Sequence, residues 1–229
     1  MSPPQAPRPP GTTPDEASLG ESRWPMAMAV LAAMTLTLLL PDDLRLAPAW
    51  VLPSVEGLLL LTLIAGDPGR IDRRSVALRV VSIALIGVLA LGAVWSTVQL
   101  IDDIVHNGKE TASPTSLLQT GANVWVGTVL AFSLLYFDLD GGGPAARLHR
   151  MPAHPALAFP QQLSPELAPA GWRPRYVDYL YLALTNATAF SPTDVMPLAP
   201  WAKITMAVQS LVSLLILGLV VARAVNVLT

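Results

Sequence analysis

Long apolar runs alternate with polar connections along most of the chain. The first four runs cover residues 24–40, 49–65, 76–101 and 121–137, and each ends at polar residues, Pro or Gly. Another run of this kind covers residues 201–227. A helix that crosses the hydrocarbon core needs about 20 consecutive apolar residues, and at least about 17. The pattern therefore predicts an all-α membrane protein with about five transmembrane helices.

The polar segments divide the chain into four regions. Residues 1–23 are rich in Pro, Ser and Thr and have no apolar periodicity, which predicts a disordered tail. Residues 24–137 form the predicted four-helix transmembrane region. Repeated prolines and three consecutive glycines predict a loop outside the hydrocarbon for residues 138–175. Residues 176–229 contain a short helical stretch before the final apolar run.

Composition agrees with a lipid environment. Hydrophobic residues make up 52% of the chain and charged residues only 13%, whereas soluble domains carry about 25% charge. The mean hydropathy is +0.51, so the lipid bilayer is the first expected partner. The net charge of -2 provides no basic stripe for a phosphate backbone, which argues against nucleic acid as a partner.

Catalytic and metal-binding motifs are missing from the sequence. The chain has no cysteine, which excludes disulfides, thiolate zinc sites and cysteine nucleophiles. His106, His149 and His154 stand alone, without the spacing of a metal site, and we expect them in solvated loops. No phosphate loop, dinucleotide fingerprint or nucleophile elbow occurs. We therefore predict no enzyme activity, no metal and no cofactor.

The distribution of arginines predicts an orientation, because cytoplasmic connections carry an excess of Arg and Lys. With a cytoplasmic N-terminus, the arginines of the tail and of residues 70–79 and 147–175 all face the cytoplasm. Only Arg45 and Lys109 then lie in outer connections. We expect a multi-pass protein of the cell (plasma) membrane with a cytoplasmic N-terminus. Charge does not predict the direction of the final helix.

Residues 176–189 form a helical stretch that is too short to cross the membrane. About 14 residues rise about 21 Å, whereas the hydrocarbon core is about 30 Å thick. Residues 190–200 are irregular in pattern and lead into the final apolar run. Irregular backbone at membrane depth is tolerated only where it is buried in protein or lines a water-filled cavity. The arrangement predicts a short re-entrant, pore-like helix.

The same stretch resembles the pore module of the potassium-channel superfamily, in which a pore helix, a filter and an inner helix follow one another. Residues 186–194 read Asn-Ala-Thr-Ala-Phe-Ser-Pro-Thr-Asp, where the family has Thr-Ala-Thr-Thr-Val-Gly-Tyr-Gly-Asp. Asp194, Pro197 and Lys203 fall in register with the family. The resemblance covers roughly residues 176–226 and implies a filter-like segment before an inner helix. The filter-like residues are Thr188, Ala189, Phe190, Ser191, Pro192, Thr193 and Asp194.

The filter-like segment departs from the family at its central positions. Ser191 and Thr193 stand where the family has glycines that present successive carbonyl groups to a dehydrated ion, and Pro192 replaces the aromatic residue. A standard potassium-selective filter is therefore not expected. The arginine distribution also predicts that this element enters the membrane from the cytoplasm, whereas in the family it enters from the outside. The segment also looks like the C-terminal region of uncharacterised bacterial multi-pass membrane proteins, which implies no activity.

Together these features predict a channel-like protein. One subunit cannot enclose a pore, so we expect a homo-oligomer, a tetramer by the resemblance, that conducts a monovalent cation. Asp194 would concentrate cations at the mouth, and Thr188 would offer oxygen atoms near the constriction. Two alternatives remain open: a non-conducting membrane scaffold or interaction protein, and a small ion-coupled transporter.

Glu56 is an ionisable residue inside the second apolar run. A charge at such a position costs several kcal/mol unless it faces a partner or water. Glu56 is therefore a candidate proton or cation site and would be the coupling carboxyl group of a transporter. Two structural alternatives are that the helix begins later, near Gly57, or that Glu56 pairs with an arginine of a neighbouring helix.

Uncharged polar residues gather around the short helix and the final helix. They either line a wet path or bond neighbouring helices to one another. Asp178 has a predicted structural role near the positive end of the short helix. The polar residues in question include Thr185, Asn186, Gln209, Ser210 and Ser213.

Overall fold

Helices form most of the described structure. The computed structural model describes residues 20–106, 108–149, 154–169, 171–188 and 194–228. The predicted tail up to residue 19 and the filter-like residues 189–193 lie outside the described residues. The helices of the bundle are α1 (Trp24–Leu39), α2 (Val51–Gly66), α3 (Val76–Val105), α4 (Pro114–Leu139), α7 (Tyr176–Thr188) and α8 (Pro200–Leu228).

Short elements join the helices of the bundle. Strand β1 (Glu21–Ser22) pairs antiparallel with β2 (Arg70–Ile71), and β3 (Leu157–Ala158) pairs antiparallel with β4 (Met196–Pro197). Two short helices are α5 (Pro144–His149) and α6 (Pro160–Leu163). Single 3-10 turns are η2 (Asp42–Leu44), η3 (Lys109–Thr111), η4 (Asp140–Gly142) and η5 (Pro165–Leu167).

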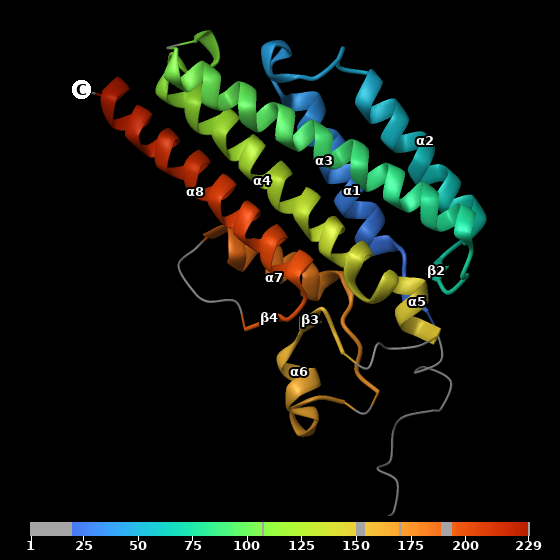
Figure 1. Cartoon of the computed structure of the whole chain (residues 1–229). Coiled ribbons are helices and arrows are strands. Elements are labelled where there is room, and N and C mark those ends of the chain that lie inside the picture. Colours follow the sequence, from blue (N-terminus) through green and yellow to red (C-terminus); the bar gives the residue numbers. More distant parts are fainter. Residues whose placement is uncertain (1–19, 107, 150–153, 170, 189–193, 229) are drawn as a thin grey trace, which may run out of the picture.

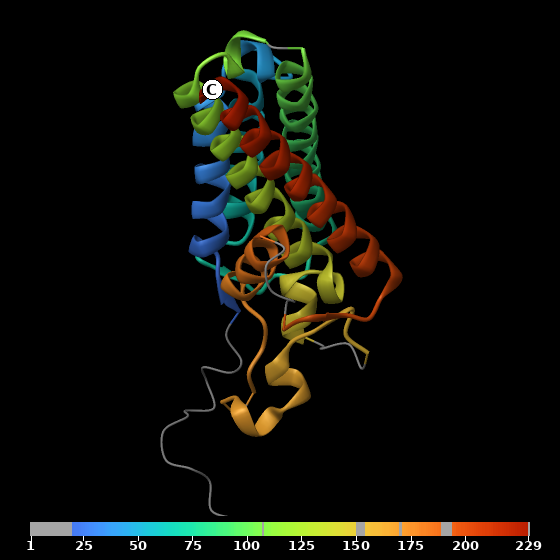
Figure 2. The ribbon, with the colours of Figure 1, turned by 90° about the vertical axis from the view of Figure 1, so that its left-hand side faces the viewer.

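Helix α4 lies at the centre of the bundle. It packs against α1, α3, α7 and α8, while α2 packs against α1 and α3 (Figure 1). Over half of its most apolar stretch is buried, against 17% for α3 and 28% for α8. The described end of α8 lies beside the α3–α4 connection, at the opposite end of the bundle from α5 and both strand pairs (Figure 2). We call the end with α5 and the strand pairs the base.

Two helices extend further than the apolar runs predict. Helix α3 continues through Asp102 and Asp103 to Val105. Helix α4 begins at Pro114, where Ser113 caps it and its Oγ accepts a hydrogen bond from the Ser116 backbone N–H at 3.1 Å. The polar residues 102–120 between the two apolar runs are therefore helical over most of their length, because capping and the position of Pro114 extend helices beyond the apolar runs.

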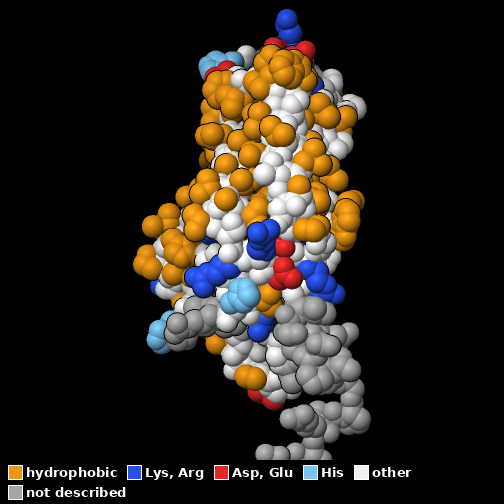
Figure 3. All heavy atoms as spheres, turned by 90° about the vertical axis from the view of Figure 1, so that its right-hand side faces the viewer, with side chains coloured by type: hydrophobic (Ala, Val, Ile, Leu, Met, Phe, Trp, Pro, Cys, Tyr) orange, Lys and Arg blue, Asp and Glu red, His pale blue; other side chains and the backbone are white. Residues whose placement is uncertain are grey.

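Three helical stretches are long and apolar enough to cross a membrane. They are α3, the continuous stretch of α4 and α5 (residues 114–149), and residues 200–225 of α8. The predicted helical fold is thereby confirmed, and three helices fit the predicted membrane location, while the five crossings and the re-entrant helix stay predictions. Helices α1 and α2 are apolar but have 16 residues each, and such a helix rises about 24 Å, short of a core about 30 Å thick. Figure 3 shows hydrophobic side chains over most of the length of one face, with charged and His side chains at both of its ends.

Residues 138–175, expected to form a loop, include short helices that pack under the bundle. The Phe159 ring of this segment makes an edge-to-face contact with Tyr179 of α7, with ring centroids 5.2 Å apart. The Arg147 guanidinium lies over the Phe137 and Tyr179 rings, and the Tyr179 hydroxyl donates to Asp140 Oδ2 at 2.6 Å. Aromatic stacking and a buried cation therefore attach this segment to α4 and α7.

Candidate functional site

A cavity lies between α1, α2, α3 and α4 and reaches from the α1–α2 connection to the middle of α4. Its volume is about 40 Å³. Since one water molecule needs about 10–15 Å³ of such space, the cavity has room for a few waters and none for a drug-sized molecule. Most of its lining is apolar. The polar lining residues are Thr37, Arg45, Glu56, Ser96 and Asn123.

Glu56 lies within the first two turns of α2 and is only 1% exposed. Its Oε2 has no hydrogen-bond partner among the residues that the structure describes. Helix α2 begins at Val51, so the alternative of a helix that starts near Gly57 is wrong. No arginine in the described part of the chain pairs with Glu56 either. Both structural explanations of this residue are thereby excluded within the described structure.

Asn123 of α4 lines the same cavity with an incompletely bonded amide. Its Nδ2 donates to the Leu36 carbonyl oxygen of α1 at 3.1 Å. Its Oδ1 is buried and receives no hydrogen bond from any described residue. Sequence reasoning missed Asn123, although an amide inside an apolar run is the same kind of signal as Glu56.

Arg45 lines the cavity from the α1–α2 connection. Its side chain is 14% exposed, and it pairs with Asp42 and donates to the Leu38 carbonyl oxygen at 2.8 Å. Its Nε is buried, and no described group accepts a hydrogen bond from it. The orientation argument uses Arg45 only as an outer charge, so its place in the cavity was not predicted.

The cavity thus combines three buried polar atoms that lack a partner within the described structure: Arg45 Nε, Glu56 Oε2 and Asn123 Oδ1. Buried polar atoms are normally bonded, and leaving one unbonded costs about 1–3 kcal/mol. The hydroxyl groups of Thr37 and Ser96 donate to carbonyl groups of their own helices and keep lone pairs available as acceptors. Donors and acceptors therefore surround a space of water size.

A second buried polar group joins α4, α7 and α8, and we call it the interhelical tie. Tyr136 Oη donates to Gln209 Oε1 at 2.7 Å, and Asn186 Nδ2 donates to the same oxygen at 2.8 Å. Gln209 Nε2 donates to the Ala183 carbonyl oxygen at 2.8 Å, and Ser210 Oγ donates to Asn186 Oδ1 at 3.0 Å. Gln209 and Ser210 therefore bond neighbouring helices, which was one of the two predicted roles.

The other polar residues of α7 form hydrogen bonds within α7 or with the residues just before it. Thr185 Oγ1 donates to the Tyr181 carbonyl oxygen at 2.9 Å, and Thr188 Oγ1 donates to the Thr185 carbonyl oxygen at 3.0 Å. Asp178 lies in the first turn of α7, where its Oδ2 accepts from the Arg175 backbone N–H at 2.7 Å. The predicted structural role of Asp178 is confirmed.

The filter-like segment is described only at its two ends. Thr188 ends α7 and is half-buried, and Asp194 is exposed. Residues 189–193, which include Ala189, Phe190, Ser191, Pro192 and Thr193, lie outside the described residues. Directly after Asp194, strand β4 pairs with β3 from the 138–175 region.

The described residues form no metal-binding cluster, and comparison with known proteins does not indicate a function for the cavity. Within the described ranges, no three His, Asp or Glu side chains gather to hold a metal ion. The resemblance of residues 176–226 to the potassium-channel pore module stays a prediction. The chain matches no protein-family model, no curated protein and no solved structure.

Proposed function

We propose that the protein is a small membrane transporter that carries protons across the bilayer, with Glu56 as the group that takes up and releases the proton. The observation that carries this proposal is the unpaired Glu56 Oε2 beside a water-sized cavity in an apolar helix bundle. Ionisable residues in such positions are costly and typically mark proton or ion pathways. A few waters in the cavity would connect Glu56 to the α1–α2 connection.

The lining favours a proton over a metal cation. Ca²⁺ and Mg²⁺ each require about six or more oxygen ligands, whereas Glu56 is the only carboxyl group among the described residues that line the cavity. The Arg45 guanidinium shares the lining and repels a second fixed positive charge. A proton needs only the carboxyl group and a chain of waters.

Proton flux in proteoliposomes tests the proposal. We expect the wild-type protein to dissipate an imposed pH gradient, reported by a pH-sensitive dye inside the vesicles. Glu56→Gln keeps the size of the side chain but removes its titration, and we expect at least about a tenfold loss of flux. Glu56→Asp, which keeps the acid, should retain part of it. Wild-type flux no faster than that of protein-free vesicles, or an unaffected Glu56→Gln, would refute the proposal.

A second candidate function is an oligomeric cation channel around residues 188–194. The observation that favours it is that α7 has only 13 residues, packs against α4 and α8 and buries its Leu182 face, as a re-entrant half-helix would. In a tetramer, Asp194 would attract cations at the mouth and α8 would form the pore wall. Ion current that Asp194→Asn reduces, together with a cross-linked tetramer, would support it. A monomer without flux would favour the non-conducting scaffold.

The transport proposal includes a topology of five crossings in the cell membrane, with α1 and α2 as short spans and a cytoplasmic base. It is supported by the arginines of the base, set against Arg45 in the α1–α2 connection and Lys109 in the α3–α4 connection at the opposite end. A reporter fused to the C-terminus tests it. An external reporter supports five crossings, and a cytoplasmic one indicates six crossings or the reverse orientation.

A further inference from the structure

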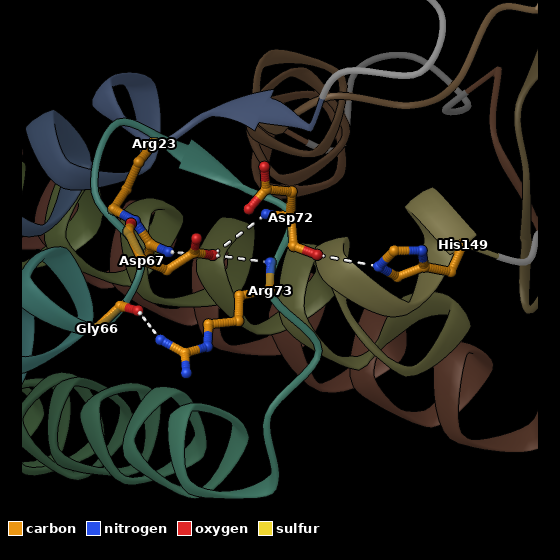
Figure 4. Close-up of polar contacts among 6 residues, drawn as sticks. All are labelled: Arg23, Gly66, Asp67, Asp72, Arg73 and His149. Carbon is orange, nitrogen blue, oxygen red and sulfur yellow. Dashed lines mark hydrogen bonds and ion pairs between the residues drawn. The ribbon is translucent and has the colours of Figure 1, made fainter.

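The α2–α3 connection carries three exposed arginines close to the base of the bundle, and we call them the basic patch. These residues are Arg70, Arg73 and Arg74. The backbone beneath them is fixed by Asp67, whose Oδ2 accepts from Arg23 Nη2 at 3.1 Å (Figure 4). The same oxygen accepts the backbone N–H groups of Asp72 and Arg73 at 3.2 Å each. One buried carboxyl oxygen therefore sets the course of the connection.

Further bonds hold the connection against its neighbours. Arg23 donates through Nε to the Asp67 carbonyl oxygen at 2.9 Å and through its backbone N–H to Gly69 at 3.0 Å. The antiparallel pairing of β1 with β2 also ties the start of the connection to the residues before α1. His149 of α5 lies with Nε2 3.0 Å from the Asp72 carbonyl oxygen (Figure 4). The basic patch is thus presented on a prearranged backbone.

The charge of the patch is largely uncompensated. Arg23 and Asp67 neutralise each other in a buried ion pair, with side chains 6% and 7% exposed. Of the acidic residues in the connection, Asp72 alone is exposed beside the three arginines. Arg73 donates one bond to the Gly66 carbonyl oxygen at 3.2 Å, and a guanidinium has five donors. Most of the N–H groups of the patch are therefore available to a ligand.

An apolar helix face begins directly beside the patch. Helix α3 starts at Val76, and its side chains Val76, Val80 and Ile83 are 83%, 60% and 49% exposed. Figure 3 shows this change from hydrophobic side chains to Arg and Asp side chains on one face of the molecule. In a bilayer, acyl chains cover such a helix face, and the adjoining arginines reach the depth of the lipid phosphates.

We propose that the basic patch binds the phosphate of an anionic phospholipid headgroup, with the acyl chains of that lipid along the exposed face of α3. Guanidinium groups donate in pairs to phosphate oxygens, which gives them a stronger hold on phosphate than a point charge. The fixed backbone of the connection lowers the entropic cost of bringing the arginines together. This lipid site is independent of the Glu56 cavity and of any transport.

Lipid binding by the purified full-length protein in a neutral detergent tests the proposal. Fluorescent phosphatidylglycerol is titrated against the protein, with phosphatidylcholine as the neutral comparison. At about a factor of five for each arginine, Arg73→Gln/Arg74→Gln should weaken phosphatidylglycerol binding by about 25-fold. Higher salt should weaken the wild-type binding in the same direction.

Lys109→Gln is the matched control, because Lys109 is an exposed cation at the opposite end of the bundle. We expect it to leave phosphatidylglycerol binding unchanged, and both variants should keep the wild-type melting temperature. Equal affinity for phosphatidylcholine would overturn the proposal, as would the same loss in Lys109→Gln. Complete displacement of the lipid by millimolar inorganic phosphate would show a free-anion site and would also overturn it.

Discussion

The base of the bundle and its interior cavity both bury carboxyl groups, but only the base supplies their partners. At the base, Asp67 pairs with Arg23 at 3.1 Å, and Asp138 pairs with Arg79 at 2.6 Å. In the cavity, Glu56 Oε2 finds no partner among the described residues. Asp67 and Asp138 are therefore paired with arginines at the base, whereas Glu56 has no charged partner in the described structure.

Under the proposed transport role, this difference would distinguish a buried charge that stabilises the fold from one that takes part in transport. A buried carboxylate that is paired and hydrogen-bonded fixes a local conformation, as Asp67 fixes the α2–α3 connection. A buried carboxyl group without a partner weakens the fold unless water or a ligand satisfies it. The proposed transfer of protons through Glu56 would explain why such a carboxyl group is kept beside a cavity. Substitutions in the two regions should therefore change stability in opposite directions.

The largest expected effect is at Asp67. Asp67→Ala leaves the buried Arg23 guanidinium without its ion-pair partner and removes the acceptor of two backbone N–H groups. We expect a loss of about 3–5 kcal/mol in the free energy of unfolding, measured by denaturant titration in detergent micelles. Asp72→Ala, at an exposed neighbour, is the control and should change stability by less than about 0.5 kcal/mol. Equal effects of the two substitutions would contradict the structural role of Asp67.

The next effect is expected at the interhelical tie, where an uncharged polar group is fully bonded. Gln209→Leu removes three hydrogen bonds, to Tyr136, Asn186 and the Ala183 carbonyl group. At about 0.6 kcal/mol for each bond inside a membrane, the loss should be about 2 kcal/mol in the same unfolding assay. Ser213→Ala tests a neighbouring position on α8 whose Oγ is buried without a partner in the described structure, and it should be close to neutral. A neutral Gln209→Leu would show that the tie contributes little.

The sequence predicts the helices of this protein well, because the length of an apolar run limits where a helix can cross or end. The short helix before the final run also appears nearly as predicted, as Tyr176–Thr188. The sequence predicts capped ends less well, since Pro114 begins α4 within a stretch that has few apolar residues. The short helices below the bundle depend on tertiary contacts such as those of Arg147.

The candidate site could be predicted only in part. Glu56 is visible because a carboxyl group interrupts an apolar run, and Asn123 gives a similar signal. Their shared cavity is not visible, because helices that are apolar on all sides carry no amphipathic pattern to show which side faces inward. The absence of a partner for Glu56 in the described structure depends on how α1, α2, α3 and α4 pack together.

The third prediction is a substitution that should raise the free energy of unfolding instead of lowering it. Glu56→Leu replaces an unpaired buried carboxyl group with an apolar side chain of similar size. We expect the free energy of unfolding to rise by about 1 kcal/mol, because the cost of an unsatisfied group is removed, while proton flux is lost. Thr62→Leu, which also replaces a polar residue of α2 but at an exposed position, should leave the flux unchanged. A loss of stability in Glu56→Leu would mean that Glu56 has a stabilising partner and belongs with the carboxyl groups of the base.

The smallest expected effect tests whether every carboxyl group at the base is as well compensated as Asp67. Burial raises the pKa of the Glu21 carboxyl from 4.5 to about 7, although the Tyr176 backbone N–H, which donates to it at 2.6 Å, and the charge of Arg147 both act to lower that pKa. Because the folded state favours the protonated acid, the contribution of Glu21 to stability is complete below about pH 4.5 and is lost as the pH rises through about 7.

After allowance for solvent screening, we expect this fall to be under about 1 kcal/mol. Melting temperatures between pH 4.5 and 8 should therefore decline more steeply for the wild type than for Glu21→Gln, which cannot titrate. Glu166→Gln, at an exposed carboxyl group below the bundle, should keep the wild-type slope. If Glu21→Gln also keeps that slope, Glu21 is compensated as fully as Asp67, and Glu56 remains the buried carboxyl group that sets the cavity apart from the base.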